Sequence, residues 1–191
     1  NQAYTVIISS AQFPAVFRYS TAPKLSPQAF LKAKAKNTTE YPLLPGPSNV
    51  FLDNAFVANA HIDHVAPSEE FWTFLGIDQG IAVDHKLLKR YEKDEGALAK
   101  KDCIVYEYQI TLKNKKKTEE DIVVWDQLPI STNEDIVVEL LEPKFKENTA
   151  TLKRNEHNFF EWYFKLKPGQ EIRMPFTFQV KYPKGRSIQG L

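Results

Sequence analysis

The sequence holds a single cysteine, Cys103, among its 191 residues, so no disulfide can form within the chain. Long apolar runs are missing as well, because no stretch approaches the roughly 18 apolar residues of a membrane-spanning helix. Neither charge dominates: 25 Lys and Arg stand against 24 Asp and Glu, a formal net charge of +1. Nucleic-acid binding needs a basic excess collected on one face. We therefore expect no membrane insertion by this chain and no nucleic-acid partner.

Glycine is sparse, with seven scattered residues, and none has the spacing of a phosphate-binding loop. The Gly-x-Ser-x-Gly turn of serine hydrolases and the His-Glu-x-x-His pattern of zinc proteases are also missing. The nearest approach to a metal site is the segment 61–64, where His61 and Asp63 would share one face of a strand but lack a third ligand. We expect no cofactor, no metal site and no catalytic residues, and therefore a protein that is not an enzyme.

Apolar residues are present in the proportion of a folded protein, at 42%, and aromatic residues make up 13% of the chain. These apolar residues recur with a period of two. The alternation is clearest in the segments 104–113, 159–166 and 176–182, where one face is apolar and the other is mixed. This pattern predicts half-buried antiparallel strands.

The first half of the chain repeats this pattern less regularly. Pro14 confines its own strand to an edge or a bulge. The segment 29–36 has good helix propensity, but its strict alternation favours a strand. Cys103 is expected to be a buried residue at a strand start, and the lysines 115–117 are expected to form a solvated hairpin tip. The remaining predicted strands are 4–9, 12–20, 50–52, 55–62, 71–75 and 81–91.

About a dozen short strands with turn signals every 8–12 residues or so predict an all-β protein with an antiparallel β-sandwich architecture. Residues 101–191 have the length and strand number of an Ig-like sandwich, and residues 1–100 are expected to form an N-terminal β-sheet region or sandwich. The two parts form either two packed sandwiches or one continuous unit. The charged segment 90–102 is the expected junction, or a short helix across one end.

Outward-facing aromatic residues are the candidates for binding. Alternation places Phe159 and Tyr163 on the polar face of their strand, and Trp72 lies in another predicted strand. Exposed rings can stack on sugars or contact a protein, unless a second sheet or a neighbouring domain covers them. Carboxylate pairs such as Glu69 and Glu70 leave a glycoside hydrolase as a third hypothesis, because that chemistry requires two carboxyl groups.

A family resemblance rests on motifs that occur in a fixed order. The motifs are 25–33 (LSPQAFLKA), 41–47 (YPLLPGP), 50–53 (VFLD), 74–78 (FLGID), 126–129 (DQLP), 139–143 (ELLEP), 166–169 (LKPG) and the closing 190–191 (GL). Through them the chain resembles the C-terminal domain of mucoidy-inhibitor-A (MuiA)-like proteins, a domain of unknown function. The resemblance implies an all-β domain that follows another small β domain and a coiled coil. It implies no catalytic residues, and the family name reflects an exopolysaccharide-related phenotype.

These observations lead to two main expectations for function. The first is a protein-interaction or assembly module, with a protein partner or self-association through an upstream coiled coil. The second is a polysaccharide-binding module. The chain begins without Met or a leader segment, so we expect it to be part of a longer protein. Near-neutral charge and a lone cysteine favour a cytoplasmic location, whereas the resemblance favours the cell envelope.

Overall fold

The computed structural model describes residues 10–52, 55–93 and 101–185. These residues form twelve strands and no helix, which confirms the predicted all-β class. The strands are β1 (Ala15–Thr21), β2 (Phe30–Lys36), β3 (Gly46–Leu52), β4 (Ala55–Ile62), β5 (Glu70–Ile77), β6 (Ile81–Lys93), β7 (Lys101–Asn114), β8 (Glu120–Gln127), β9 (Val137–Glu142), β10 (Leu152–Arg154), β11 (Phe159–Leu166) and β12 (Glu171–Pro183).

The chain divides into two compact units. The first unit comprises Asn1–Arg18 and Phe30–Gly76, and the second comprises Tyr19–Ala29 and Ile77–Leu191. The second unit therefore includes β6, most of which precedes the expected junction. The predicted domains 1–100 and 101–191 stay a prediction.

The first unit contains β2, most of β5, the beginning of β1 and the two-stranded sheet of β3 and β4. Its β2 strand alternates between buried and half-buried residues, as the period of two predicts for a strand. Asn37, directly after β2, is fully buried. Its side-chain amide donates hydrogen bonds to the carbonyls of Tyr41, Val65 and Ala66 at 3.0–3.3 Å, which fixes the loop that follows.

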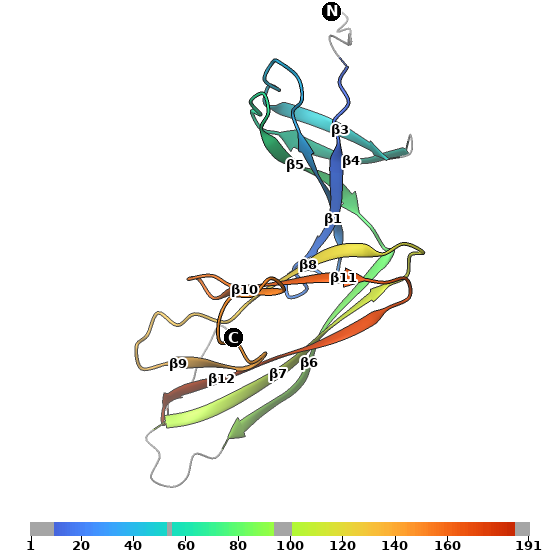
Figure 1. Ribbon diagram of the computed structural model, residues 1–191. Coiled ribbons are helices and arrows are strands. Elements are labelled where there is room, and N and C mark those ends of the chain that lie inside the picture. The colour runs from blue at the N-terminus through green and yellow to red at the C-terminus, as the bar shows by residue number, and fades with distance from the viewer. Residues whose placement is uncertain (1–9, 53–54, 94–100, 186–191) are drawn as a thin grey trace, which may run out of the picture. The chain divides into compact units, whose positions relative to one another are not determined.

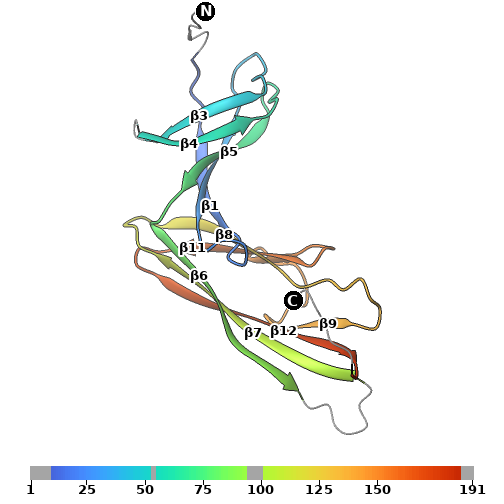
Figure 2. The ribbon, with the colours of Figure 1, turned by 180° about the vertical axis from the view of Figure 1, so that it is seen from behind.

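The second unit is a β-sandwich. One sheet has the order β6-β7-β12-β9, and the other contains β10-β11-β8 with the end of β1 next to β8. Figures 1 and 2 show these two layers from opposite sides, with β8 and β11 in one and β7 and β12 in the other. The predicted antiparallel β-sandwich is confirmed.

The core of this sandwich is built by the three segments with the clearest alternation. Phe176 of β12 contacts Phe160 and Trp162 of β11 across the two sheets, with ring centroids 5.8 and 5.9 Å apart. Ile110 and Leu112 of β7 are fully buried on the same side as Phe176. The inward faces predicted for these strands are therefore confirmed, whereas Val105 and Gln179 are buried although they lie on the predicted outer faces.

Some local features differ from the prediction or lie outside the described residues. Residues 19–21 pair in parallel with residues 122–124, although antiparallel strands were expected, and β1 begins at Ala15, so Pro14 lies outside the strand. Cys103 is buried in β7, as predicted. The strand predicted at 4–9 and most of the junction at 90–102 lie outside the described residues.

Candidate interaction surfaces

Two of the predicted aromatic residues share one outward face of the second unit. Phe159 and Tyr163 lie on β11, and Trp125 lies opposite Glu161 on the neighbouring strand β8. Phe159 is 37% and Trp125 is 40% exposed. The Lys153 ammonium lies 5.2 Å from the centre of the Tyr163 ring. We call Trp125, Phe159 and Tyr163 the aromatic platform.

The third predicted aromatic residue, Trp72, lies on β5 in the first unit. Trp72 is 43% exposed, and the Arg18 guanidinium carbon lies 4.5 Å from the centre of its ring. Such a cation–π contact holds an aromatic ring in place at the surface. Trp72 is therefore a separate exposed ring in its own unit, and the platform is defined without it.

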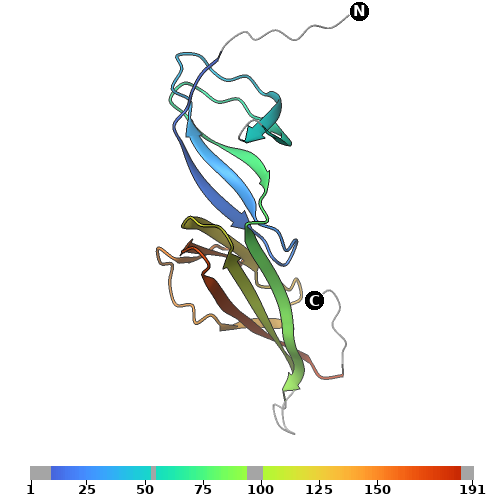
Figure 3. The same cartoon turned by 90° about the vertical axis from the view of Figure 1, so that its right-hand side faces the viewer.

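The C-terminal half of β6 forms a second surface. In the described part of the chain, β6 is an end strand of its sheet and pairs only with β7. Leu87, Leu88 and Tyr91 are 44%, 49% and 44% exposed. A β-bulge between Leu87 and Lys89 leaves Leu88 without a register partner on β7. Figure 3 shows β6 in green beside β7. We call residues 86–93 the β6 edge.

The β6 edge is basic. Lys86, Lys89, Arg90 and Lys93 stand against one acidic residue, Glu92. Arg90 donates a hydrogen bond of 3.3 Å to the Tyr106 hydroxyl, and Lys89 lies 3.9 Å from a carboxylate oxygen of Glu107. This surface was not predicted from the sequence. The signal that indicates it is the pair of consecutive apolar residues 87 and 88 within an alternating strand, because such a pair places an apolar side chain outside the regular pattern.

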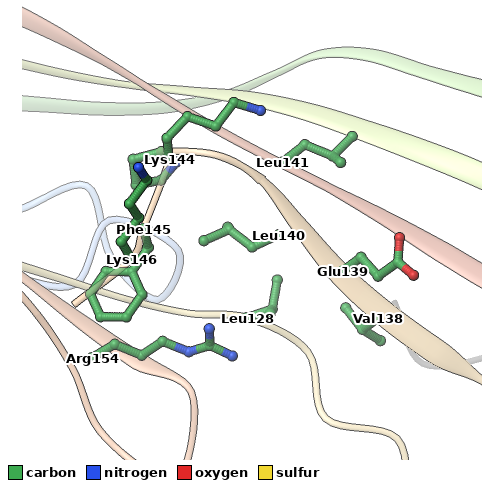
Figure 4. Close-up of a pocket in the computed structure, with 10 residues that line it drawn as sticks. Leu128, Val138, Glu139, Leu140, Leu141, Lys144, Phe145, Lys146 and Arg154 are labelled. Atoms are coloured by element: carbon green, nitrogen blue, oxygen red, sulfur yellow. The ribbon is translucent and has the colours of Figure 1, made fainter.

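A pocket of about 510 Å³ opens beside β9 in the second unit. Figure 4 shows the aliphatic side chains of Leu128, Val138 and Leu140 around it, with Phe145 and Arg154 at one end. Val138 and Leu140 are only half-buried, although they pair with core residues of β12. The remaining lining residues are Glu139, Leu141, Pro143, Lys144 and Lys146.

Arg154 is held rigidly at this pocket. Its Nε and Nη2 atoms donate to Asn158 Oδ1 at 3.1 and 2.5 Å. Its guanidinium carbon lies 5.8 Å from the Phe145 ring centre and 5.4 Å from that of Phe160. Asn158 adopts a positive φ of 59°, a conformation that asparagine tolerates. The sequence carried no local signal for this residue, because two of its partners, Phe145 and Asn158, lie in segments of irregular pattern.

A polar network surrounds Tyr19 in the second unit. The Tyr19 hydroxyl donates to Asp78 Oδ2, and Lys116 donates to Tyr19, both at 2.5 Å. Burial raises the pKa of Tyr19 to about 12, and the hydrogen bond to Asp78 raises it as well. Lys116 also lies 3.1 Å from a Glu120 oxygen. The expectation that the lysines 115–117 form a solvated tip was thus wrong for Lys116, which is partly buried by this network.

A second buried polar pair joins the two sheets of the sandwich. His85 Nε2 of β6 lies 3.5 Å from Asp126 Oδ2 of β8. The His85 ring stacks on Tyr108 at a centroid distance of 4.9 Å. Asp126 Oδ1 accepts a hydrogen bond of 2.7 Å from the Gln127 N–H, whereas its buried Oδ2 has no hydrogen-bond partner. The pair thus connects β6 of one sheet with β8 of the other.

For metal binding and membrane insertion, the structure bears on the described residues only. Within them, no three His, Cys, Asp or Glu side chains lie close enough together to hold a metal ion. They also include no helix long and apolar enough to cross a bilayer. Asp63 and both histidines of the segment 61–64 lie at the end of β4 and in the loop after it.

The fold and these surfaces define an all-β domain with a sandwich unit and several exposed apolar surfaces. Residues 6–184 match the family described as a domain of unknown function, DUF4139, and the chain belongs to this family. It is also similar to "Protein F37C4.5" of Caenorhabditis elegans, with 27% identity over 176 residues, 88% of this chain and 32% of that protein. The chain thus spans about a third of that relative's length. No solved structure matches it.

Proposed function

We propose that this chain is a non-enzymatic protein-interaction module that adds an extended, acidic segment of a partner protein to the β6 edge. The observation that carries the proposal is the exposure of Leu87, Leu88 and Tyr91 on an end strand. An end strand offers unpaired backbone N–H and C=O groups to an incoming strand, and its side chains provide specificity.

The charge of the β6 edge selects the kind of partner. Lysines on an end strand usually discourage pairing between copies, because like charges then face each other. Antiparallel pairing of two β6 edges would bring Lys86 and Lys89 close to the Arg90 and Lys93 of the second copy. An acidic strand is instead attracted to this edge, because each of its carboxylates can approach one of these cations. The partner strand is therefore acidic, with apolar residues that cover Leu87 and Leu88.

The Tyr19 network has a structural role in this proposal. A tyrosine that acts as a general acid or base needs a pKa near the working pH. Burial instead raises the pKa of Tyr19 to about 12, which keeps its hydroxyl protonated. The Tyr19, Asp78 and Lys116 side chains satisfy one another, and we assign them a structural role.

The test uses two fluorescein-labelled peptides of ten residues, one alternating Glu with Val and the other alternating Lys with Val. Fluorescence anisotropy should show that the Glu peptide binds, more weakly as salt is added, and that the Lys peptide does not. Leu88→Glu should weaken binding by about tenfold or more, because it adds a repulsive charge. Leu25→Glu is the matched control, since Leu25 is 86% exposed and lies in a loop. Equal effects of the two substitutions would contradict the proposal, as would equal binding of the two peptides.

A second candidate function is polysaccharide binding at the aromatic platform. Two exposed rings, Trp125 and Phe159, on one face of a sheet suit stacking against sugar rings. Tyr163 donates a hydrogen bond to Glu161, and this carboxylate could also accept one from a sugar hydroxyl. A glycan array with the wild-type chain and with Trp125→Ala tests this function. A hit that Trp125→Ala does not reduce would contradict it.

The wider protein is part of the same proposal. We infer a mucoidy-inhibitor-A-like protein whose C-terminal domain is this chain and whose second unit is Ig-like. The resemblance of the motifs 25–33 and 41–47 supports this inference. Self-association through an upstream coiled coil would bring several β6 edges together, which strengthens binding to a partner with repeated acidic segments. Glycoside hydrolysis has no structural observation in its favour and is not proposed.

A further inference from the structure

We propose that the pocket beside β9 binds a small aliphatic carboxylate, such as a medium-chain fatty acid, with its head group on Arg154. This pocket is separate from the β6 edge and from the aromatic platform, and the inference does not depend on the proposed function. Its volume of about 510 Å³ lies within the range of small-molecule sites, which is about 300–1,000 Å³.

The head group is assigned by Arg154. The structure gives this guanidinium no ion pair with a described residue, although Asn158 and two aromatic rings hold it in place. Nε and one N–H of Nη2 already donate to Asn158, and the parallel N–H groups of Nη1 and Nη2 that remain match the two oxygens of a carboxylate. Because the side chain is already fixed, a ligand loses little side-chain entropy when it binds there.

The surrounding charges also favour an anion. Lys144 and Lys146 lie in the loop after β9; Lys144 lies 3.9 Å from a Glu142 carboxylate oxygen, whereas Lys146 forms no ion pair with a described residue. The one carboxylate that lines the pocket, Glu139, accepts hydrogen bonds from Gln179 and Lys181. Figure 4 shows the Glu139 carboxylate at the opposite end of the pocket from Arg154. The end that contains Arg154 is therefore positively charged.

The tail is assigned by the aliphatic lining. Leu128, Val138 and Leu140 offer no side-chain donor or acceptor, so a ligand with polar groups along its length would lose their hydrogen bonds to water. A methylene chain loses none and buries apolar surface against these residues. A peptide C-terminus shares the carboxylate but carries amide groups that these side chains cannot satisfy.

The experiment is isothermal titration calorimetry of the chain with hexanoate, octanoate and decanoate. Affinity should rise about fourfold for each added methylene, which corresponds to about 0.8 kcal/mol of buried CH₂. Octanol and octylamine carry the same tail without a carboxylate and should bind at least tenfold more weakly than octanoate. Absence of octanoate binding at millimolar concentration, or equal binding of octylamine, would overturn the proposal.

Variants locate the site. Arg154→Gln should abolish octanoate binding, whereas Arg154→Lys should retain part of it because the charge remains without the fork. Arg173→Gln is the matched control, since that arginine is 67% exposed on β12. Val138→Thr keeps the shape of the lining and should weaken decanoate binding severalfold. Unchanged binding in both Arg154 variants overturns the site, and tighter binding of a peptide with a free C-terminal leucine assigns the pocket to a partner protein instead.

Discussion

The Tyr19 hydroxyl lies 2.5 Å from the Lys116 ammonium nitrogen, and these residues are 97 positions apart in the sequence. Burial raises the pKa of Tyr19 to about 12 from an ordinary value of 10.0. The pKa of Lys116 is also raised: burial opposes this, but the hydrogen bonds to Tyr19 and Glu120 outweigh it. Both groups therefore stabilise the fold in their protonated forms.

Because the pKa values of Tyr19 and Lys116 are raised in the folded chain, we predict that the chain loses stability at alkaline pH. The contribution of Tyr19 should be complete below pH 10 and should disappear as the pH rises to 12. Urea unfolding should show that wild type loses about 1–2 kcal/mol more than Tyr19→Phe over this interval. Parallel pH profiles for wild type and Tyr19→Phe would contradict the prediction.

Gly80 permits the close approach of Asp78 and Lys116. A methyl group at Gly80 would lie 2.7 Å from Lys116 Cγ and 2.9 Å from Asp78 Oδ1. Gly80→Ala should therefore destabilise the chain by about 1–3 kcal/mol, because the lysine must leave its position. Gly46→Ala is the control, since nothing lies within 4 Å of the added methyl group there. Thermal unfolding of the two variants separates these outcomes, and equal melting temperatures would contradict the account.

The His85–Asp126 pair predicts a second stability effect. His85→Phe keeps a ring on Tyr108 but removes the nitrogen that faces the buried Asp126 carboxylate. An uncompensated buried carboxylate should cost about 3 kcal/mol or more of unfolding free energy. The double variant with Asp126→Leu should recover most of this loss. If His85→Phe alone is as stable as wild type, the pair does not join the sheets.

Neighbouring residues of β11 test the alternation itself. Phe160 is fully buried, whereas Phe159 is 37% exposed on the opposite face. Phe160→Ala should destabilise the chain by about 3–5 kcal/mol, and Phe159→Ala by less than about 1 kcal/mol. Denaturant midpoints measure the difference directly. Comparable losses for the two variants would show that another part of the protein covers the aromatic platform.

Sequence periodicity predicted the parts of the fold that depend on local pattern. The alternation in β7, β11 and β12 correctly indicated which face is buried, and it identified Phe159 as outward-facing. It did not predict the parallel pairing of residues 19–21 with 122–124, because strand neighbours far apart in sequence leave no local trace.

The pocket and the Tyr19 network could not be predicted for the same reason. Arg154 and Leu140 come from different sheets, and only the fold brings them to one pocket. Lys116 stands among three adjacent lysines that look alike in sequence, yet Lys116 alone of them bonds to Tyr19. Composition and spacing gave no reason to distinguish it from Lys115 and Lys117.

Hydrogen exchange of the chain with and without the acidic Glu–Val peptide tests the central claim most directly. Strand addition at β6 predicts slower exchange of amides within residues 86–93, because a new strand pairs with them. Amides of β9, the end strand on the other side of the same sheet, should exchange as before. Protection confined to β9 or to the aromatic platform, or no protection at saturating peptide, would contradict the account.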